Sequence, residues 1–133
     1  MNRYVLLANN RKVGAMERVT GIGGLFFRAK DTKALAQWYA QHLGIGDGPY
    51  GLWSQEAGPT VFAPFAQDTD YFGRDSQQWM LNLRVSNMDA MLAQLAAAGI
   101  TAETRAEWDS PETGRFARIH DPEGNPVELW EPA

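Results

Sequence analysis

The sequence predicts an α+β protein in which two βαβββ modules form a curled mixed sheet around a central cavity, with one helix outside each module. Three observations lead to this fold. Residues 25–31 and 81–87 both read as a short apolar strand that leads into a helical pattern, which indicates an internal repeat. Both helical patterns stop at an equivalent glycine, Gly44 or Gly99. A turn signal at residues 121–125 joins two strand patterns near the end of the chain.

The first module spans about residues 19–65. Its first strand ends at Asp31, whose carboxylate can accept hydrogen bonds from the free amides that begin a helix. The apolar face of that helix has i, i+3, i+4 spacing and consists of Leu35, Trp38, Tyr39 and Leu43. Two further strands are expected near residues 50–54 and 60–65, with a turn at Gly58-Pro59 between them.

The second module spans about residues 79–132 and follows a linker of residues 66–78. Asn87 is the expected cap of its helix, and Ser86 with Asp89 matches the outline of a capping box. The helix face consists of Met91, Leu92 and Leu95. Strands are expected near residues 101–108, 114–120 and 126–131. Because proline presets φ and glycine supplies a positive φ in the turn at 121–125, the last two strands should form a hairpin.

Length and composition indicate one globular domain. The chain has 133 residues and an apolar fraction of 44%, so we assign residues 16–133 to a single domain. Residues 1–15 contain three basic side chains and no acidic one. We expect this segment to be a leader or a disordered extension, and the alternative is an extra strand in which residues 4–7 pair on a sheet edge.

Charge and residue usage exclude several classes of function. The net charge is −4, which disfavours a nucleic-acid partner because phosphate contacts need a basic face. No apolar run approaches the roughly 20 residues of a membrane span, so no membrane partner is expected. The chain has no cysteine, which removes thiol nucleophiles and thiolate metal sites and is compatible with the cytoplasmic location that we expect.

These patterns resemble the vicinal oxygen chelate superfamily, which includes glyoxalase I, extradiol dioxygenases, and the fosfomycin- and bleomycin-resistance proteins. The resemblance covers about residues 19–132. It rests on the repeated βαβββ order, on Arg28-Ala29-Lys30-Asp31 before the first helix, and on the run Asp121-Pro122-Glu123-Gly124-Asn125-Pro126-Val127-Glu128-Leu129. The resemblance implies a glyoxalase-like member, and since one fold hosts many chemistries it leaves the activity open.

In the metal-dependent members of the resembled superfamily, four side chains from four strands hold a divalent ion. Carried over by motif, these positions fall on Gly24, Phe62, Met80 and Glu128. Only Glu128 has an oxygen ligand, and the methionine thioether does not suit Mg²⁺, Mn²⁺ or Zn²⁺. We therefore expect neither the usual metal nor another cofactor.

Three arguments give the side chains that we expect to face the cavity and bind the ligand: strand alternation started from these positions, the resemblance to the fosfomycin-resistance proteins, which implies Phe116 and Arg118, and the match between the two hairpin turns, which adds Tyr50 and Leu52. They are Phe26, Tyr50, Leu52, Phe62, Met80, Asn82, Phe116, Arg118 and Trp130. The alternative is that the large apolar members fill a closed core. Glu128 is the candidate catalytic residue, with three interpretations: a leftover metal ligand, a general acid or base, or the partner of Arg118 in a buried ion pair. The ion pair is favoured, and Arg118 alternatively receives an anionic ligand.

The expected function is to bind or convert an unknown apolar or aromatic small molecule without the usual metal. One alternative is a non-catalytic binding protein of the bleomycin-resistance kind, and another is a metal-dependent lyase or dioxygenase with a nonstandard site. Whether the protein is an enzyme stays open. A homodimer is expected because the resembled superfamily often completes its cavities between chains.

Overall fold

A computed structural model describes residues 16–133, and the predicted leader at residues 1–15 lies outside them. Along the chain, the elements are helix α2 (Thr32–Leu43), the 3-10 turn η2 (Pro49–Gly51), strand β1 (Leu81–Arg84), helix α3 (Met88–Ala97), the 3-10 turn η3 (Ala106–Trp108), and strands β2 (Gly114–His120) and β3 (Pro126–Pro132). Within the described residues these elements make an α+β fold with one mixed sheet.

Both helices begin and end where the sequence predicts. The Asp31 side chain accepts a hydrogen bond from the amide of Ala34, and α2 stops at Gly44, whose φ of 69° is left-handed. Asn87 caps α3 in the same way, through the amide of Ala90. In place of the expected capping box, a residue distant in the sequence caps α3: the amide of Met88 donates to the Glu131 carboxylate of β3 at 2.7 Å.

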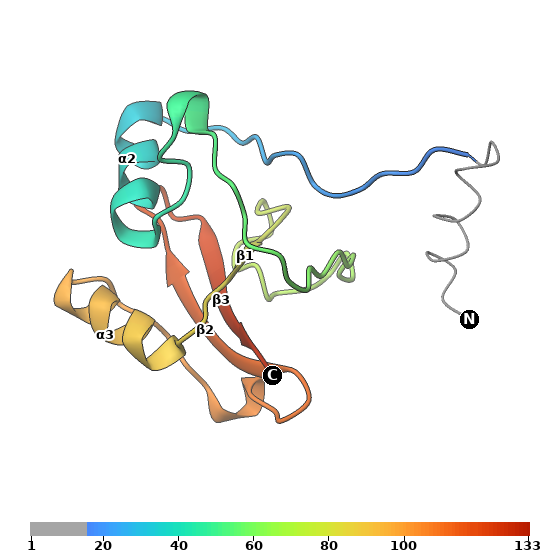
Figure 1. Ribbon diagram of the computed structural model, residues 1–133. Coiled ribbons are helices and arrows are strands. Elements are labelled where there is room, and N and C mark those ends of the chain that lie inside the picture. The colour runs from blue at the N-terminus through green and yellow to red at the C-terminus, as the bar shows by residue number, and fades with distance from the viewer. Residues whose placement is uncertain (1–15) are drawn as a thin grey trace.

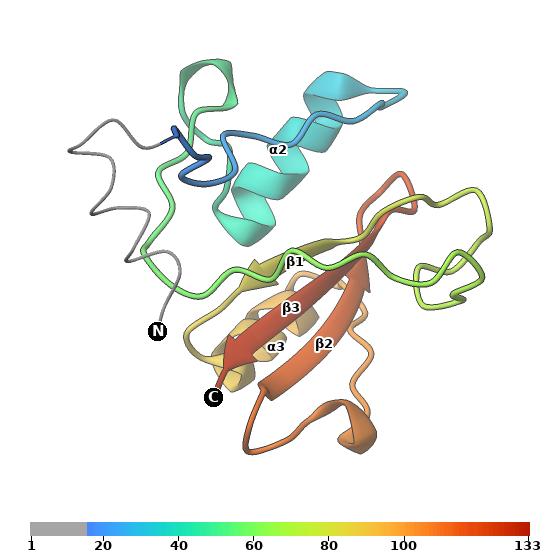
Figure 2. The same ribbon diagram turned by 90° about the vertical axis from the view of Figure 1, so that its right-hand side faces the viewer.

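The sheet has the order β1-β3-β2, with β3 parallel to β1 and antiparallel to β2. Both helices lie on the same side of it, as Figures 1 and 2 show from two directions. The core fills this side. Its fully buried strand residues are Ala117, Ile119, Val127 and Leu129, which pack with Leu35 and Tyr39 of α2 and with Met88 and Leu95 of α3. The segment between η2 and β1 crosses the opposite side of the sheet.

The turn between β2 and β3 connects the hairpin to the first helix. Asp121 is buried, and its carboxylate accepts hydrogen bonds from the amides of Glu123 and Asn125, from the Asn125 side chain, and from the Tyr39 hydroxyl at 2.7 Å. Gly124 completes the turn with a φ of 83°. The next carboxylate, Glu123, accepts the amides of Lys30 and Asp31, which lead into α2. The predicted hairpin is confirmed, and it holds α2 in place.

The strands predicted in the first module do not form within the described part of the chain. Tyr50 lies in η2 with a positive φ of 58°, and residues 52–65 have no sheet partner. In the second module, the expected strand at residues 101–108 shortens to one bridge between Glu103 and Arg118, followed by η3. A strand is stable only when its amides and carbonyls pair with a neighbour, and the first module offers none.

The predicted strand residues of the first module are consequently exposed. Phe26 and Phe62 are 94% and 89% exposed, and Leu52 is 69% exposed. The described residues thus form a three-stranded sheet on the second module, with α2 docked against it, rather than the full curled sheet. None of the helices in residues 16–133 has the length and apolar character that crossing a membrane requires.

Tyr39→Phe should lower the free energy of unfolding by about 1–3 kcal/mol, because it takes a hydroxyl donor from the buried Asp121 carboxylate. Urea denaturation followed by tryptophan fluorescence at a fixed protein concentration measures the change. Tyr50→Phe is the matched control, since the Tyr50 side chain is fully exposed and its change should stay within about 0.5 kcal/mol. Equal changes in the two variants would contradict the role of the Tyr39–Asp121 bond.

Candidate functional site

One row of polar side chains crosses the sheet on the side away from the helices. The strand register places Asn82 of β1 opposite Glu128 of β3, and Glu128 opposite Arg118 of β2. Because alternate residues of a strand point to opposite faces, these three share a face with the next row, Arg84, Trp130 and Phe116. We call this surface, made of these six residues, the open face.

Glu128 lies at the centre of the row and is held by two donors. The amide nitrogen of Asn82 donates to Oε1 at 2.7 Å. The hydroxyl of Tyr71, from the linker between the modules, donates a short hydrogen bond to Oε2. Both carboxylate oxygens are therefore engaged by neutral groups, and Glu128 is half-buried. A carboxylate in this state has its charge stabilised without a cation in direct contact.

The predicted ion pair between Arg118 and Glu128 is not formed within residues 16–133, although the two residues are direct neighbours across β2 and β3. The Arg118 guanidinium instead lies over the ring of Tyr71, with its central carbon 4.1 Å from the ring centroid. The Trp108 ring is 5.5 Å away from the same carbon. The pairing fails because Tyr71 and Asn82 already supply donors to Glu128 and because cation–π stacking holds the guanidinium.

Tyr71 is the residue of this site that sequence reasoning missed. It belongs to a linker without hydrophobic periodicity, so no pattern indicated that its side chain would face Glu128. Burial, together with the hydrogen bond and the negative charge of Glu128, raises the pKa of Tyr71 to about 12, and Arg118 opposes this rise. The hydroxyl therefore stays protonated at neutral pH and keeps donating to Glu128.

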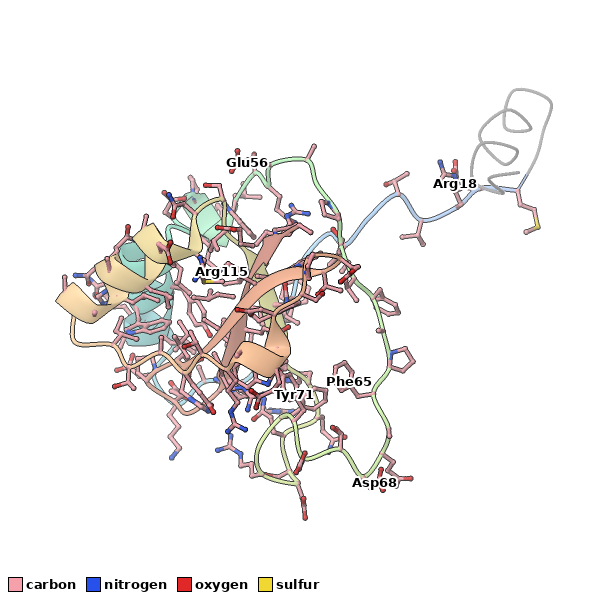
Figure 3. All side chains as sticks on the ribbon, turned by 90° about the horizontal axis from the view of Figure 1, so that it is seen from below. Arg18, Glu56, Phe65, Asp68, Tyr71 and Arg115 are labelled. Carbon is pink, nitrogen blue, oxygen red and sulfur yellow. The ribbon has the colours of Figure 1, made fainter. Side chains whose placement is uncertain are left out.

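Aromatic side chains border the polar row. The rings of Phe116 and Trp130 are stacked, with centroids 6.2 Å apart and planes 6° from parallel. Phe65 stacks on Tyr71 on the other side of the row, at 6.0 Å. Figure 3 shows Phe65 and Tyr71 on the segment that passes the sheet. A few polar groups among aromatic walls are the usual composition of a small-molecule site.

Arg84 ends β1 and ties the first module to the open face. Its guanidinium donates to the backbone carbonyls of Glu56, at 2.7 Å, and Pro59. These contacts tether residues 56–59 to the end of β1. The side chain holds the turn at Gly58-Pro59, which the repeat pattern identified as the counterpart of the turn at residues 121–125.

The structure brings together four residues of the predicted ligand-binding set with the predicted catalytic residue. Asn82, Phe116, Arg118, Trp130 and Glu128 share the open face, and Met80 precedes Asn82 by two positions. The members from the first module are not gathered there: Phe26, Tyr50, Leu52 and Phe62 are exposed, and Tyr50 is turned out on η2. Their predicted role in ligand binding requires strands that do not form within residues 16–133.

Two hollows mark the surface of the described residues near the sheet. One of about 480 Å³ lies between α2 and the end of β2 and is lined by Trp38, Gly99, Ile100, Thr101, Glu103, Arg118, His120, Asp121 and Pro122. Another of about 390 Å³ lies at the far end of β2 and β3, around Ser110 and Glu131. Arg118 is the one residue of the polar row that lines the first hollow.

Comparisons with known proteins agree with this fold. A family model for the glyoxalase-like domain matches residues 24–130. The crystal structure of TnmS3, an antibiotic binding protein from Streptomyces sp. CB03234, superposes with a TM-score of 0.58 at 22% identity, covering 89% of this chain and 100% of that one. A glyoxalase/bleomycin resistance protein from the same organism is 23% identical, with a TM-score of 0.49, over 78% of this chain and 94% of that one. No curated protein matches the chain.

Glu128→Gln should lower the pKa of Tyr71 from about 12 toward its ordinary value of 10, because the negative charge that disfavours the phenolate is removed. Ultraviolet titration of tyrosinate, as the difference between each protein and its Tyr71→Phe counterpart, isolates this one hydroxyl.

The raised pKa of Tyr71 also determines how the stability of the protein changes with pH. The contribution of Tyr71 to stability is complete below pH 10 and declines as the pH rises to about 12, so Tyr71→Phe should flatten that part of the stability profile. A Tyr71 titration that is the same in the wild type and in Glu128→Gln would contradict the contact.

Proposed function

This chain belongs to the glyoxalase-like domain family of the vicinal oxygen chelate superfamily, and on that premise we propose that it binds an apolar or aromatic small molecule on the open face without a bound metal. The observation that carries the proposal is the row of Asn82, Glu128 and Arg118 between aromatic side chains. The row supplies an amide, a carboxylate and a guanidinium on one surface, which is enough to orient a ligand that the aromatic rings hold by contact.

The donor chemistry supports binding without the superfamily's usual metal. Of the four positions that the resemblance assigns to the metal, Gly24, Phe62 and Met80 offer no oxygen or nitrogen side-chain ligand. The fourth, Glu128, uses both oxygens to accept from Asn82 and Tyr71. Among residues 16–133, no three His, Cys, Asp or Glu side chains gather in a way that could hold an ion. These residues do not fit a divalent ion.

Binding is the first function proposed, and conversion of the ligand through Glu128 is the second. The structure that matches at TM-score 0.58 is that of an antibiotic binding protein, so this fold accommodates a small molecule in that case. The hydrogen bond between Tyr71 and Glu128 favours the second candidate, since the pair is positioned to exchange a proton with a bound molecule. Glu128 would then act as the general acid or base.

A thermal-shift screen of aromatic small molecules tests the proposed site. Glu128→Ala and Arg118→Ala should each weaken binding of a hit about tenfold or more, because each removes a charge-assisted contact. Arg115→Ala is the matched control on the same strand, since Arg115 pairs with Asp89 of α3, away from the open face, and its loss should leave affinity unchanged.

Two further readouts complete that experiment. A panel of divalent ions should give no saturable shift, and mass spectrometry of each hit after incubation separates conversion from binding. Full affinity in both Glu128→Ala and Arg118→Ala would rule out the open face. A stoichiometric metal in the purified protein would overturn binding without a metal.

The exposed first module supports a homodimer as the assembled form, and we place a second copy over it. Large apolar side chains that strands would normally cover are exposed there: Val19, Ile22, Leu25, Phe26, Leu52, Val61, Phe62 and Phe65. The flanking backbone has no sheet partner, so it presents free amides and carbonyls as well as apolar surface. A second copy offers the same unpaired segments, and mutual pairing would complete the curled two-module sheet around a shared cavity.

Sedimentation or light scattering should give about twice the chain mass of 14.8 kDa. Phe26→Glu together with Phe62→Glu should shift the protein to the mass of one chain, because a buried unpaired carboxylate opposes the interface. Gln37→Glu adds one negative charge at an exposed position of α2, compared with two in the double variant, and should leave the dimer intact. A wild-type protein that is monomeric at micromolar concentration would contradict the dimer.

A further inference from the structure

Two nitrogen atoms of Arg118, Nε and Nη2, are buried and have no hydrogen-bond partner within residues 16–133. Two aromatic rings pack beside the guanidinium, since its central carbon lies 4.1 Å from the ring centroid of Tyr71 and 5.5 Å from that of Trp108. A buried donor without an acceptor is costly, and the cost is larger for a charged group. The N–H donors along the Nε–Nη2 edge of the guanidinium therefore lack a hydrogen-bond acceptor within residues 16–133.

The geometry of that edge specifies the acceptor. The Nε and Nη2 hydrogens of arginine point in the same direction and form a fork that matches the two oxygens of a carboxylate. Two acids lie directly opposite Arg118: Glu128 on β3, whose two oxygens already accept from other groups, and Glu103 at the bridge, whose carboxylate contacts Arg105. The fork is thus available for a carboxylate from outside the described chain.

A second arginine, whose side chain is exposed, shows which group such a fork binds beside the same tryptophan. Arg105 also lies over the Trp108 ring, with its central carbon 5.4 Å from the ring centroid. Its Nε and Nη2 both contact Oε2 of Glu103, at 2.7 and 2.6 Å. Arg105 and Arg118 thus both lie over Trp108. The Nε–Nη2 edge of Arg105 contacts a carboxylate, whereas the same edge of Arg118 has no acceptor within residues 16–133.

We propose that the Arg118 fork receives the carboxylate of the bound small molecule, so that the ligand is an aromatic carboxylate. This inference rests on the proposed function and narrows its ligand class. Phe116 and Trp130 stand in the next row, two residues along the strand and therefore about 7 Å away, which is the span of a one- or two-ring aromatic acid. The aromatic part of the ligand packs on these rings while its carboxylate occupies the fork.

Entry of the carboxylate requires a local movement of the linker, because the two nitrogen atoms are buried beside Tyr71. The negative charge of Glu128 does not exclude a second carboxylate, since Tyr71 and Asn82 stabilise it by hydrogen bonds and Arg118 adds a positive charge. The competing outcome is that Glu128 itself turns to the fork when Tyr71 moves. In that case the site would have no preference for an acid.

Calorimetric titration of the full-length protein with 2-naphthoate and 2-naphthamide decides between these outcomes. The two probes have the same shape, and only the acid can fill the fork as an anion. The wild type should bind the acid at least about tenfold more tightly than the amide, because charge-assisted hydrogen bonds are the stronger kind. Arg118→Lys keeps a positive charge but lacks the fork, so it should lose most of this preference.

The matched control is Arg105→Lys, which alters the other arginine on Trp108 and should keep the full preference for the acid. Equal affinity of the wild type for the two probes would overturn the carboxylate site while leaving an aromatic-binding open face standing. A preference that survives Arg118→Lys, or absence of any naphthoate binding, would also overturn it. Circular dichroism checks that Arg118→Lys is folded, and the comparison of acid with amide in the wild type stands without that variant.

Discussion

The buried carboxylate of Asp121 is the constraint on which the rest of the structure depends. It accepts three hydrogen bonds within its own turn and a fourth from Tyr39 of α2. A buried anion without these donors would be costly, so the turn, the hairpin and the helix must be in place together. Burial, reinforced by Asp121, also raises the pKa of Tyr39, which keeps its hydroxyl a donor. The hairpin register follows from this turn, and the register aligns the polar row.

Carboxylates of the second module act similarly at both helix starts. Glu123 accepts two amides that lead into α2, and Glu131 accepts the first amide of α3. Free amides at a helix start carry partial positive charge, so each contact stabilises the helix and orients it against the sheet. Because these contacts draw both helices to one face, the opposite face of β2 and β3 stays uncovered by helix. The open face is a consequence of how the helices are anchored.

Local signals in the sequence predicted much of this arrangement. The caps at Asp31 and Asn87, the turn at residues 121–125 and the alternation along β2 and β3 depend on a few neighbouring residues, and each is present. Alternation also placed Glu128 and Arg118 on one face. The strands of the first module depend on a partner strand that residues 16–133 do not supply, so local patterns overestimated them. Tyr71 could not be predicted, because its contact with Glu128 joins residues 57 positions apart through an aperiodic linker.

The proposed binding at the polar row depends on the absence of an ion pair between Arg118 and Glu128 within residues 16–133. Had the guanidinium of Arg118 paired with the carboxylate of Glu128, neither group would have been available to a ligand. Two neutral donors, Asn82 and Tyr71, instead stabilise the carboxylate, and the guanidinium packs against the rings of Tyr71 and Trp108. As a result, the Nε–Nη2 edge of Arg118 has no hydrogen-bond acceptor within residues 16–133, while packing on Tyr71 holds the side chain in place. The Arg118 side chain itself is already ordered, so on binding the ordering cost falls on the linker beside Tyr71, which has to move to admit the ligand.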